Sequence, residues 1–370
     1  MGEWAETSLQ ALLKFGNGKS RPKNDGMIPV YGGNGILGYS DQTNYDGDII
    51  VIGRVGAYCG ATYFESRPIW VSDNALSARA KDENDPKFLY YHLKNLGLNQ
   101  FAEGSSHPLV THTLLNAIDT SVPKDPREQK AIAEVLSSLD NKIDLLHRQN
   151  KTLESLVETL FRNWFIDGAQ DDWEPTTVGE IVTIKGGTTP STKSPEFWDG
   201  DICWTSPRDL SNQSSVYLFD TTRKITTAGL AQIGSGLMPV GTVLMSSRAP
   251  IGYLTIADIP VAINQGYIAM VCDKSVSSHF VYLWCKANME SIKNAGNGST
   301  FEEISKSNFK ALECLLPPPS LLSDFEIQAE ALFQKIHDNS KQVLELEKIR
   351  NTLLPKLMSG DVRVEYEAAS

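Results

Sequence analysis

The chain has 370 residues, of which 41% are hydrophobic and 21% are charged, so it can bury cores and is not a disordered protein. It has no run of about 18 uncharged apolar residues and no basic-then-apolar leader, so we expect neither a membrane span nor a secretory signal. The net charge of −11 argues against nucleic-acid binding unless basic side chains gather locally. Five scattered cysteines without a Cys-x-x-Cys pair argue against disulfides and a zinc site, and predict a cytoplasmic protein: Cys59, Cys203, Cys272, Cys285 and Cys314.

Residues 1–124 predict a mixed α+β domain. Trp4 begins a segment that reaches a Gly-rich loop at Gly16–Gly18, and the apolar run Ile49–Ile52 lies between turn residues, as a strand does. Asp85-Pro86 predicts the start of a helix. One face of that helix carries Phe88, Leu89, His92, Leu93 and Leu96.

Residues 125–168 predict a long helix. Asp125 is placed to cap it, with Pro126 at the first helical position and Glu128 three residues after the cap. Apolar residues then recur at steps of three and four, with Asn150 filling the one gap: Ile132, Leu136, Leu139, Ile143, Leu146, Leu153, Val157 and Leu160. A stripe with this period over about four heptads predicts a coiled-coil seam.

Residues 169–319 repeat the pattern of the first domain. Trp173 matches Trp4, and Gly186-Gly187 matches the first Gly-rich loop. Further matches follow in the same order: Gly47–Arg54 with Gly241–Arg248, Phe88–Tyr90 with Phe280–Tyr282, Gly104–Ser106 with Gly298–Thr300, and Val122–Pro123 with Leu316–Pro317. The run Val243–Met245 predicts a strand, and Ser278 is placed to cap a helix. The preserved order favours an internal repeat over the chance similarity of two α+β domains.

Residues 320–360 predict a second long helix, followed by a tail at 361–370. Ser323-Asp324-Phe325-Glu326 has the form of a capping box, and Gly360 ends the pattern. Polar Asn339 and Arg350 lie on the same stripe as its apolar positions. The stripe consists of Ala329, Leu332, Ile336, Val343, Leu346, Leu353 and Leu357.

Neither long helix can bury a narrow apolar stripe alone, which favours packing of the two helices against each other. The connection between Trp164 and Trp173 is too short to run back along a helix, so we expect antiparallel packing. This arrangement places the two domains at opposite ends, related by a pseudo-twofold axis. The alternative is that each helix lies on its own domain.

Short motifs that would indicate catalysis fail on inspection. Gly33–Gly38 has Gly-x-Gly-x-x-Gly spacing but precedes no apolar helix, and Gly18-Lys19-Ser20 lacks the first glycine of a phosphate loop. Asp125, Glu128 and Lys130 mimic a nuclease set, but a helix cap explains them better. The sequence has no adenine-methyltransferase motif, and its six histidines lack partners at ligand spacing. We therefore expect no catalytic residue, metal or cofactor in this chain.

Polar side chains gather in the expected loops of both copies. Lys, Arg, Ser and Thr side chains contact phosphates, and Arg and Asn recognise base edges. The candidate DNA-binding residues are Lys19, Arg21, Lys23, Asn34, Arg54, Tyr58, Ser105, His107, Thr188, Thr189, Ser191, Lys193, Arg208, Arg248, Tyr253, Asn297 and Ser299. The alternative is that these Gly-, Ser- and Lys-rich loops are ordinary solvated turns.

The arrangement resembles the DNA-specificity (S) subunit of Type I restriction–modification systems over essentially the whole chain. In the second copy the motifs are Trp173, Gly186–Ser191, Phe197–Ile202, Trp204, Asp209-Leu210, Gly298–Phe301 and Ile304. In the first copy they are Val122–Ile132 and Leu136–Ile143, at the start of the long helix. No single motif is specific, but the set is.

This resemblance implies two target-recognition domains, 1–124 and 169–319, each recognising one half of a bipartite DNA sequence. The helices 125–168 and 320–360 would set the spacer and dock two modification subunits, which would carry S-adenosylmethionine and the methyl-transfer chemistry. Restriction subunits would complete the complex, and this chain would be non-catalytic.

The sequence departs from the family pattern in two places. Gly16–Pro22 replaces a Gly-Gly-Thr-Pro form, as expected if the two halves recognise different bases, and residues 317–322 lack a Glu-Gln pair at the start of the second helix. Two other classes of function stay open, namely an enzyme in its own right and a two-headed scaffold that binds carbohydrate or protein.

Overall fold

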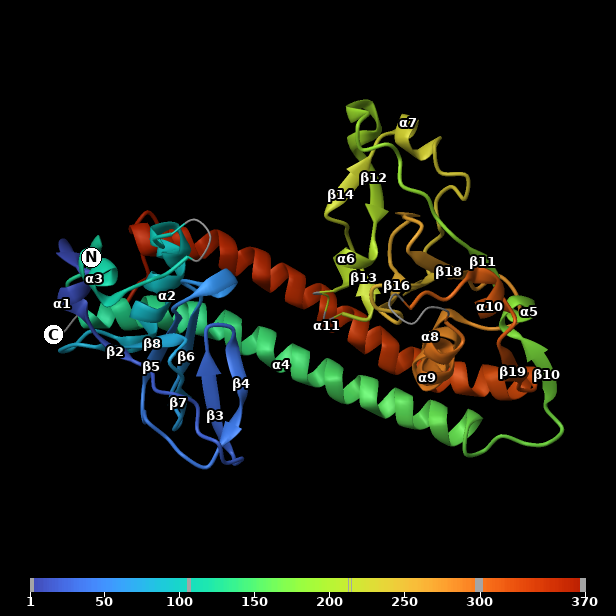
Figure 1. Ribbon diagram of the computed structural model, residues 1–370, viewed down its shortest axis with the longest axis horizontal. Coiled ribbons are helices and arrows are strands. Elements are labelled where there is room, and N and C mark those ends of the chain that lie inside the picture. Colours follow the sequence, from blue (N-terminus) through green and yellow to red (C-terminus); the bar gives the residue numbers. More distant parts are fainter. Residues whose placement is uncertain (1–2, 105–107, 212, 214, 297–301, 367–370) are drawn as a thin grey trace. The chain divides into compact units, whose positions relative to one another are not determined.

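The computed structural model describes residues 3–104, 108–211, 213, 215–296 and 302–366. The chain forms two compact units, coloured along the sequence in Figure 1. Unit 1 comprises Met1–Asp144 and Leu344–Ser370, and unit 2 comprises Leu145–Val343. Each unit therefore contains one globular domain and a part of each of the two long helices. Over the described ranges, every helix is too short or too polar to cross a bilayer.

Unit 1 is a mixed α+β domain. Its elements are β1 (Trp4–Ser8), α1 (Leu9–Leu12), β2 (Leu13–Asn17), β3 (Ile28–Gly32), β4 (Gly35–Ser40), β5 (Ile49–Gly53), η1 (Gly56–Tyr58), β6 (Thr62–Glu65), β7 (Trp70–Val71), β8 (Ala75–Ala80), α2 (Pro86–Leu96), η2 (Leu98–Phe101), α3 (His112–Asn116) and β9 (Asp119–Pro123). The strands form an antiparallel sheet β2-β8-β5-β6, a sheet β4-β3-β7 in which β3 and β7 are parallel, and the pair β1-β9.

Unit 2 contains a larger domain of the same class. Its elements are β10 (Glu174–Thr177), α5 (Val178–Ile181), β11 (Thr183–Lys185), η3 (Pro195–Phe197), β12 (Trp198–Thr205), α6 (Pro207–Leu210), β13 (Tyr217–Leu218), β14 (Arg223–Ile225), α7 (Thr227–Leu230), β15 (Val243–Ser246), β16 (Leu254–Ala257), β17 (Ala262–Ile263), β18 (Tyr267–Val271), α8 (Ser278–Ala287), α9 (Met289–Asn294), α10 (Lys306–Lys310) and β19 (Glu313–Leu316).

The predicted internal repeat is confirmed by strand topology. The order β11-β18-β15-β16 corresponds to β2-β8-β5-β6, and the sheet β14-β12-β17 corresponds to β4-β3-β7. In both three-stranded sheets the middle strand pairs in parallel with the last strand. The pair β10-β19 corresponds to β1-β9. The second copy adds α6, β13 and α7, which account for its extra residues after the Gly-rich loop.

The predicted domain helices form, with one boundary corrected. Asp85 caps α2 as expected, because its Oδ1 accepts a hydrogen bond from the backbone N–H of Phe88 at 2.8 Å. The expectation that Ser278 caps α8 is wrong by one residue, because Ser277 Oγ accepts from Phe280 N–H at 3.1 Å and Ser278 is the first helical residue.

The two long helices are α4 (Pro126–Phe165) and α11 (Pro319–Ser359). In unit 1, Arg350 Nη1 of α11 donates to Asp140 Oδ1 of α4 at 2.8 Å. In unit 2, Asn150 Nδ2 of α4 donates to Ser340 Oγ of α11 at 3.0 Å. A later residue of α4 thus meets an earlier residue of α11, which confirms the antiparallel pairing.

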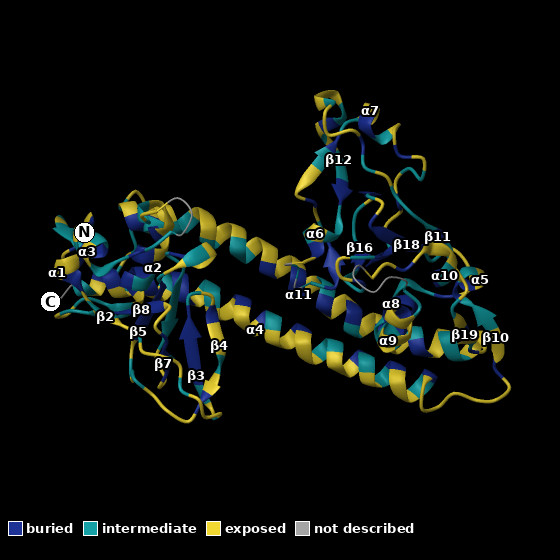
Figure 2. Cartoon of the chain, in the orientation of Figure 1, coloured by how far each residue is buried: buried dark blue, intermediate teal, exposed yellow. Residues whose placement is uncertain are grey.

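The stripe predicted for the seam lies on the inner side of both helices, and Figure 2 shows exposed residues along their outer sides. The buried members are Ile132, Leu136, Ile143, Leu146, Val157, Ala329, Ile336, Val343 and Leu357. The partly buried members are Leu139, Leu153, Leu160, Leu332, Leu346 and Leu353. Of the polar positions of the stripe, Asn150 and Asn339 are also buried, and Arg350 is partly buried.

The expected cap and first residue of α4 are confirmed, whereas the capping box expected at the start of α11 is wrong. The helix α11 begins at Pro319, so Ser323 lies inside it. Asp125 does cap α4 by accepting from Arg127 N–H at 2.9 Å, and its hydrogen bonds from the Arg127 side chain and backbone lower its pKa to about 2. Glu128, however, does not return to the cap, because its carboxylate is 1% exposed and pairs with Arg363.

Single-stripe reasoning missed four buried phenylalanines on the long helices: Phe161, Phe165, Phe325 and Phe333. The Phe165 and Phe325 rings lie 4.9 Å apart, and the Phe161 ring lies 5.3 Å from that of Phe280 on α8. The helices in unit 2 therefore bury a second face against the globular domain, in addition to the seam.

Replacing Asn150 with Ala is expected to lower the free energy of unfolding by about 1–3 kcal/mol, because buried Asn339 Nδ2 would lose an acceptor and buried Ser340 Oγ would lose a donor. Asn339 Nδ2 donates to Asn150 Oδ1 at 2.9 Å, in addition to the Asn150–Ser340 bond. Urea unfolding of the full chain measures the change. The double variant Asn150→Leu/Asn339→Leu should cost less than the sum of the single variants Asn150→Leu and Asn339→Leu, and strict additivity would contradict the coupling.

Candidate nucleic-acid interface

In unit 1 the loops that follow β2, β5 and β7 meet at one end of the sheets, together with the segment before α3. Backbone N–H to carbonyl hydrogen bonds join them: Lys19 to Val71 (3.0 Å), Arg54 to Asn74 (3.0 Å) and Gly56 to Pro108 (3.1 Å). The β3–β4 turn joins the same end, since a Cβ on Gly33 would stand 3.7 Å from the Val55 carbonyl oxygen. At this end of the domain, backbone hydrogen bonds between the loops therefore hold them together as one group.

Most described candidates of the first copy lie on this group of loops. Lys23 does not, because its neighbour Asn24 donates through Nδ2 to Asp41 Oδ2 at 3.1 Å, just after the end of β4 and away from the β3–β4 turn. Lys19, Arg21, Lys23, Asn34 and Tyr58 are exposed, and Arg54 is partly buried. Arg21 lies against Gly38, where a Cβ would stand 2.5 Å from its guanidinium Nη2. Ser105 and His107 fall outside the described residues.

Unit 2 brings the equivalent loops together. The backbone bonds are Thr188 N–H to Ile263 (3.0 Å), Asn264 N–H to Thr205 (3.1 Å), Ser247 N–H to Gly266 (2.8 Å) and Ile304 N–H to Ser247 (3.0 Å). The same end of the repeated fold therefore gathers loops in both domains.

The candidates of the second copy differ in exposure and in whether their side chains already have hydrogen-bond or ion-pair partners. Thr188, Ser191, Lys193 and Arg208 are exposed, whereas Thr189 Oγ1 donates to Gln265 Oε1 at 2.7 Å. Arg248 is paired with Glu303 at 3.4 Å, which offsets its charge. Tyr253 is partly buried next to β16, and Asn297 and Ser299 lie outside the described residues.

The glycine of each Gly-rich loop is required by close backbone contact. A Cβ on Gly18 would stand 1.7 Å from the Ser72 carbonyl oxygen, and one on Gly187 would stand 1.8 Å from that of Ile263. Any side chain would therefore push the loop off the neighbouring strand end. The matched glycines of the two copies were the sequence signal of this contact.

Sequence reasoning missed an aromatic cluster behind the loop of unit 2. The rings of Trp198 and Trp204 meet edge to face at 5.1 Å, and the Arg223 guanidinium lies 3.4 Å from the Trp198 ring centre. The two tryptophans were visible in the sequence, but their partner Arg223 lies on β14 and meets them only in the folded sheet.

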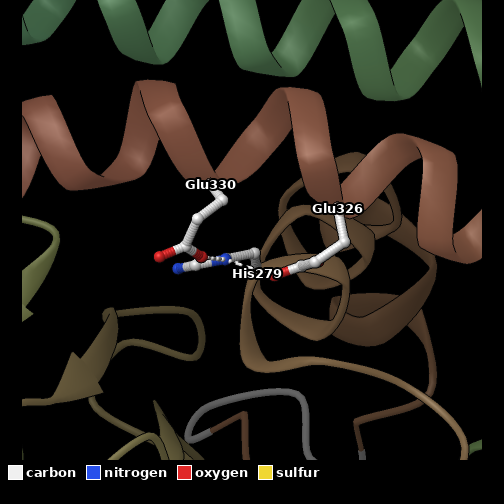
Figure 3. Close-up of side chains that lie close together, drawn as sticks. All are labelled: His279, Glu326 and Glu330. Atoms are coloured by element: carbon white, nitrogen blue, oxygen red, sulfur yellow. Dashed lines mark hydrogen bonds and ion pairs between the residues drawn. The ribbon is translucent and has the colours of Figure 1, made fainter.

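In the described part of the chain, one group of three residues could offer ligand atoms to a metal: His279, Glu326 and Glu330 (Figure 3). Hydrogen bonds already engage it, because His279 Nδ1 is 2.7 Å from Glu326 Oε1 and Ser277 Oγ donates to Glu326 Oε2. Burial raises the pKa of Glu326, but the bonds from His279 and Ser277 outweigh it and leave the pKa below its ordinary value. The group links α8 to α11 and is not part of the loops.

A family model described as Type I restriction modification DNA specificity domain matches residues 1–155 and 170–345. The MjaIX specificity subunit of Methanocaldococcus jannaschii is 35% identical over 194 residues, which cover 52% of this chain and 45% of that relative. The HindI specificity subunit of Haemophilus influenzae is 21% identical over 336 residues, covering 70% and 72%.

A solved structure has the same fold. The S subunit of a Type I restriction–modification system from M. genitalium has a TM-score of 0.67 at 20% identity, with 96% of each chain covered. Both halves of the present chain match the family model, and the two halves share their strand topology. The chain belongs to the family of Type I restriction modification DNA specificity domains, and it carries that domain twice.

Proposed function

We propose that this chain is the DNA-specificity subunit of a Type I restriction–modification complex, in which each domain recognises one half of a bipartite target. The observation that carries the proposal is that two topologically equivalent domains gather the same set of loops at the same end. The loops differ in sequence between the copies, as two different half-sites require.

The loop side chains provide the chemistry for this role. Exposed Lys19 and Arg21 supply cationic donors in unit 1, and Lys193 and Arg208 supply them in unit 2. Such side chains bind phosphates and, where they reach the major groove, the edges of guanine. The hydroxyls of Thr188 and Ser191 add neutral donors.

The long helices suit a second role, the docking of modification subunits. In unit 2, Leu145, Leu156 and Ile327 expose 40%, 53% and 70% of their surface on the helices. In unit 1, Leu344 and Ile349 expose 46% and 47%. Exposed apolar side chains mark protein-binding surfaces where they form a contiguous patch. We expect two modification subunits with S-adenosylmethionine, and restriction subunits in the full complex.

The acidity of the chain limits what it can do alone. The net charge is −11, and neither domain has an excess of basic residues. We therefore expect the isolated chain to bind DNA weakly in about 0.15 M salt, with affinity gained from the assembled complex. A fluorescence-anisotropy titration of the isolated chain that gave nanomolar, sequence-specific binding would contradict this expectation.

Methylation mapping tests the proposed function. The chain is co-expressed with the modification subunits of its own system in a host without other methylation, and modified sites are located by long-read sequencing. We expect one bipartite motif with a fixed spacer, and a change in only one half of it when residues 19–23 are replaced. Methylation that does not depend on this chain would favour a carbohydrate- or protein-binding scaffold instead.

A further inference from the structure

The Gly-rich loops of the two domains are fixed at the same point. Lys19 and Thr188 each follow the glycine that packs on a strand end, and each donates its backbone N–H to the last residue of the equivalent strand. That acceptor is Val71 at the end of β7 in unit 1 and Ile263 at the end of β17 in unit 2, both at 3.0 Å.

In both domains the carbonyl of that loop residue accepts a hydrogen bond from an indole. Trp70 Nε1 donates to the Lys19 carbonyl at 3.2 Å, and Trp204 Nε1 donates to the Thr188 carbonyl at 3.3 Å. In unit 2 a second indole, Trp198 Nε1, donates to the Ser191 carbonyl at 3.0 Å. The backbone of the loop is thus held by its N–H and its carbonyl together.

The two indoles come from different strands. In the parallel pair of unit 1, Val30 of β3 is opposite Trp70 of β7. In the equivalent pair of unit 2, Trp204 of β12 is opposite Ala262 of β17. At this paired position the tryptophan lies on the last strand in unit 1 and on the middle strand in unit 2. The carbonyl that it contacts is nevertheless the equivalent one, that of the residue after the loop glycine. The shared contact therefore does not follow from a shared sequence position.

We propose that Trp70 and Trp204 are positioning residues for DNA recognition, which hold the backbone of the loop so that its side chains meet the bases in a set orientation. This inference rests on the proposed function. A backbone contact restrains the loop whatever side chains it carries, so the loop sequence can change between half-sites while its path is kept. Side chains that recognise bases must be held to within about 0.5 Å, which a free Gly-rich loop does not achieve.

Trp70→Phe and Trp204→Phe test the inference, because phenylalanine keeps a packed ring and removes the N–H donor. Each variant is assembled as the full chain with its modification subunits, and methylation is measured on a DNA library randomised in each half-site. Losing one neutral hydrogen bond predicts about a two- to tenfold loss of discrimination. Trp70→Phe should relax only the half-site of unit 1, and Trp204→Phe only the other.

Trp284→Phe is the matched control, because Trp284 is a buried residue of α8 with 9% exposure, outside the loops. It should lower the melting temperature as much as Trp204→Phe does and leave both half-sites unchanged. The inference would be overturned if Trp284→Phe changed selectivity as much as Trp204→Phe does. It would also be overturned if neither Trp70→Phe nor Trp204→Phe changed selectivity. A wild-type complex without bipartite recognition would instead refute the proposed function.

Discussion

Removal of one heptad from each long helix is expected to shorten the spacer of the DNA target by about three base pairs and to leave both half-sites unchanged. Seven residues of helix span about 10 Å, against 3.4 Å per base pair. The segments to delete are 141–147 of α4 and 343–349 of α11. Each cut preserves the steps of three and four along its own seam, and only the two cuts together keep both the Asp140–Arg350 and the Asn150–Ser340 contacts.

The expected change is measured by methylation of a library in which the spacer varies in length. Deletion of 141–147 alone is the control, because it shifts one seam against the other and should prevent assembly with the modification subunits. A complex that keeps its spacer after the paired deletion, or that changes a half-site, would show that the helices do not set the distance.

Arg363→Ala is expected to destabilise unit 1 by about 3 kcal/mol, because it would leave a buried carboxylate without its cation. The Glu128 side chain is 1% exposed, and the Arg363 guanidinium contacts it and lies 5.2 Å from the Trp4 ring centre. Arg363 is 28% exposed, so water can reach part of the site, and the loss should fall at the lower end of the range for broken buried pairs.

Thermal unfolding and hydrogen exchange of the first turns of α4 measure this loss. Glu128→Gln/Arg363→Ala should regain most of the stability, since a neutral amide costs far less to bury than an unpaired charge. A double variant less stable than Arg363→Ala alone would mean that Arg363 acts mainly through its contact with Trp4.

The seam illustrates what could be predicted. A stripe with steps of three and four is a local property of the chain, and both long helices formed along it. The aromatic stripe of Phe161, Phe165, Phe325 and Phe333 was missed, because a residue that faces a second partner looks irregular against one period. Glu128 was misjudged for the same reason, since its partner Arg363 is far away in sequence.

Part of the candidate interface could likewise be predicted from the sequence, and part could not. The sequence identified the Gly-rich loops and their donors, but it could not show that Arg248 is paired with Glu303. It also could not show that Trp70 and Trp204 reach equivalent carbonyls, because they occupy different strands of the repeat.

The internal repeat, the two long helices and the loops with exposed donors follow from the amino-acid sequence, because periodicity, caps and glycines act over a few neighbouring residues. Which loops meet, which charges are neutralised and which indoles hold the backbone depends on the folded arrangement. Those contacts join strands and helices distant in the chain, and their geometry exists only once the sheets have paired.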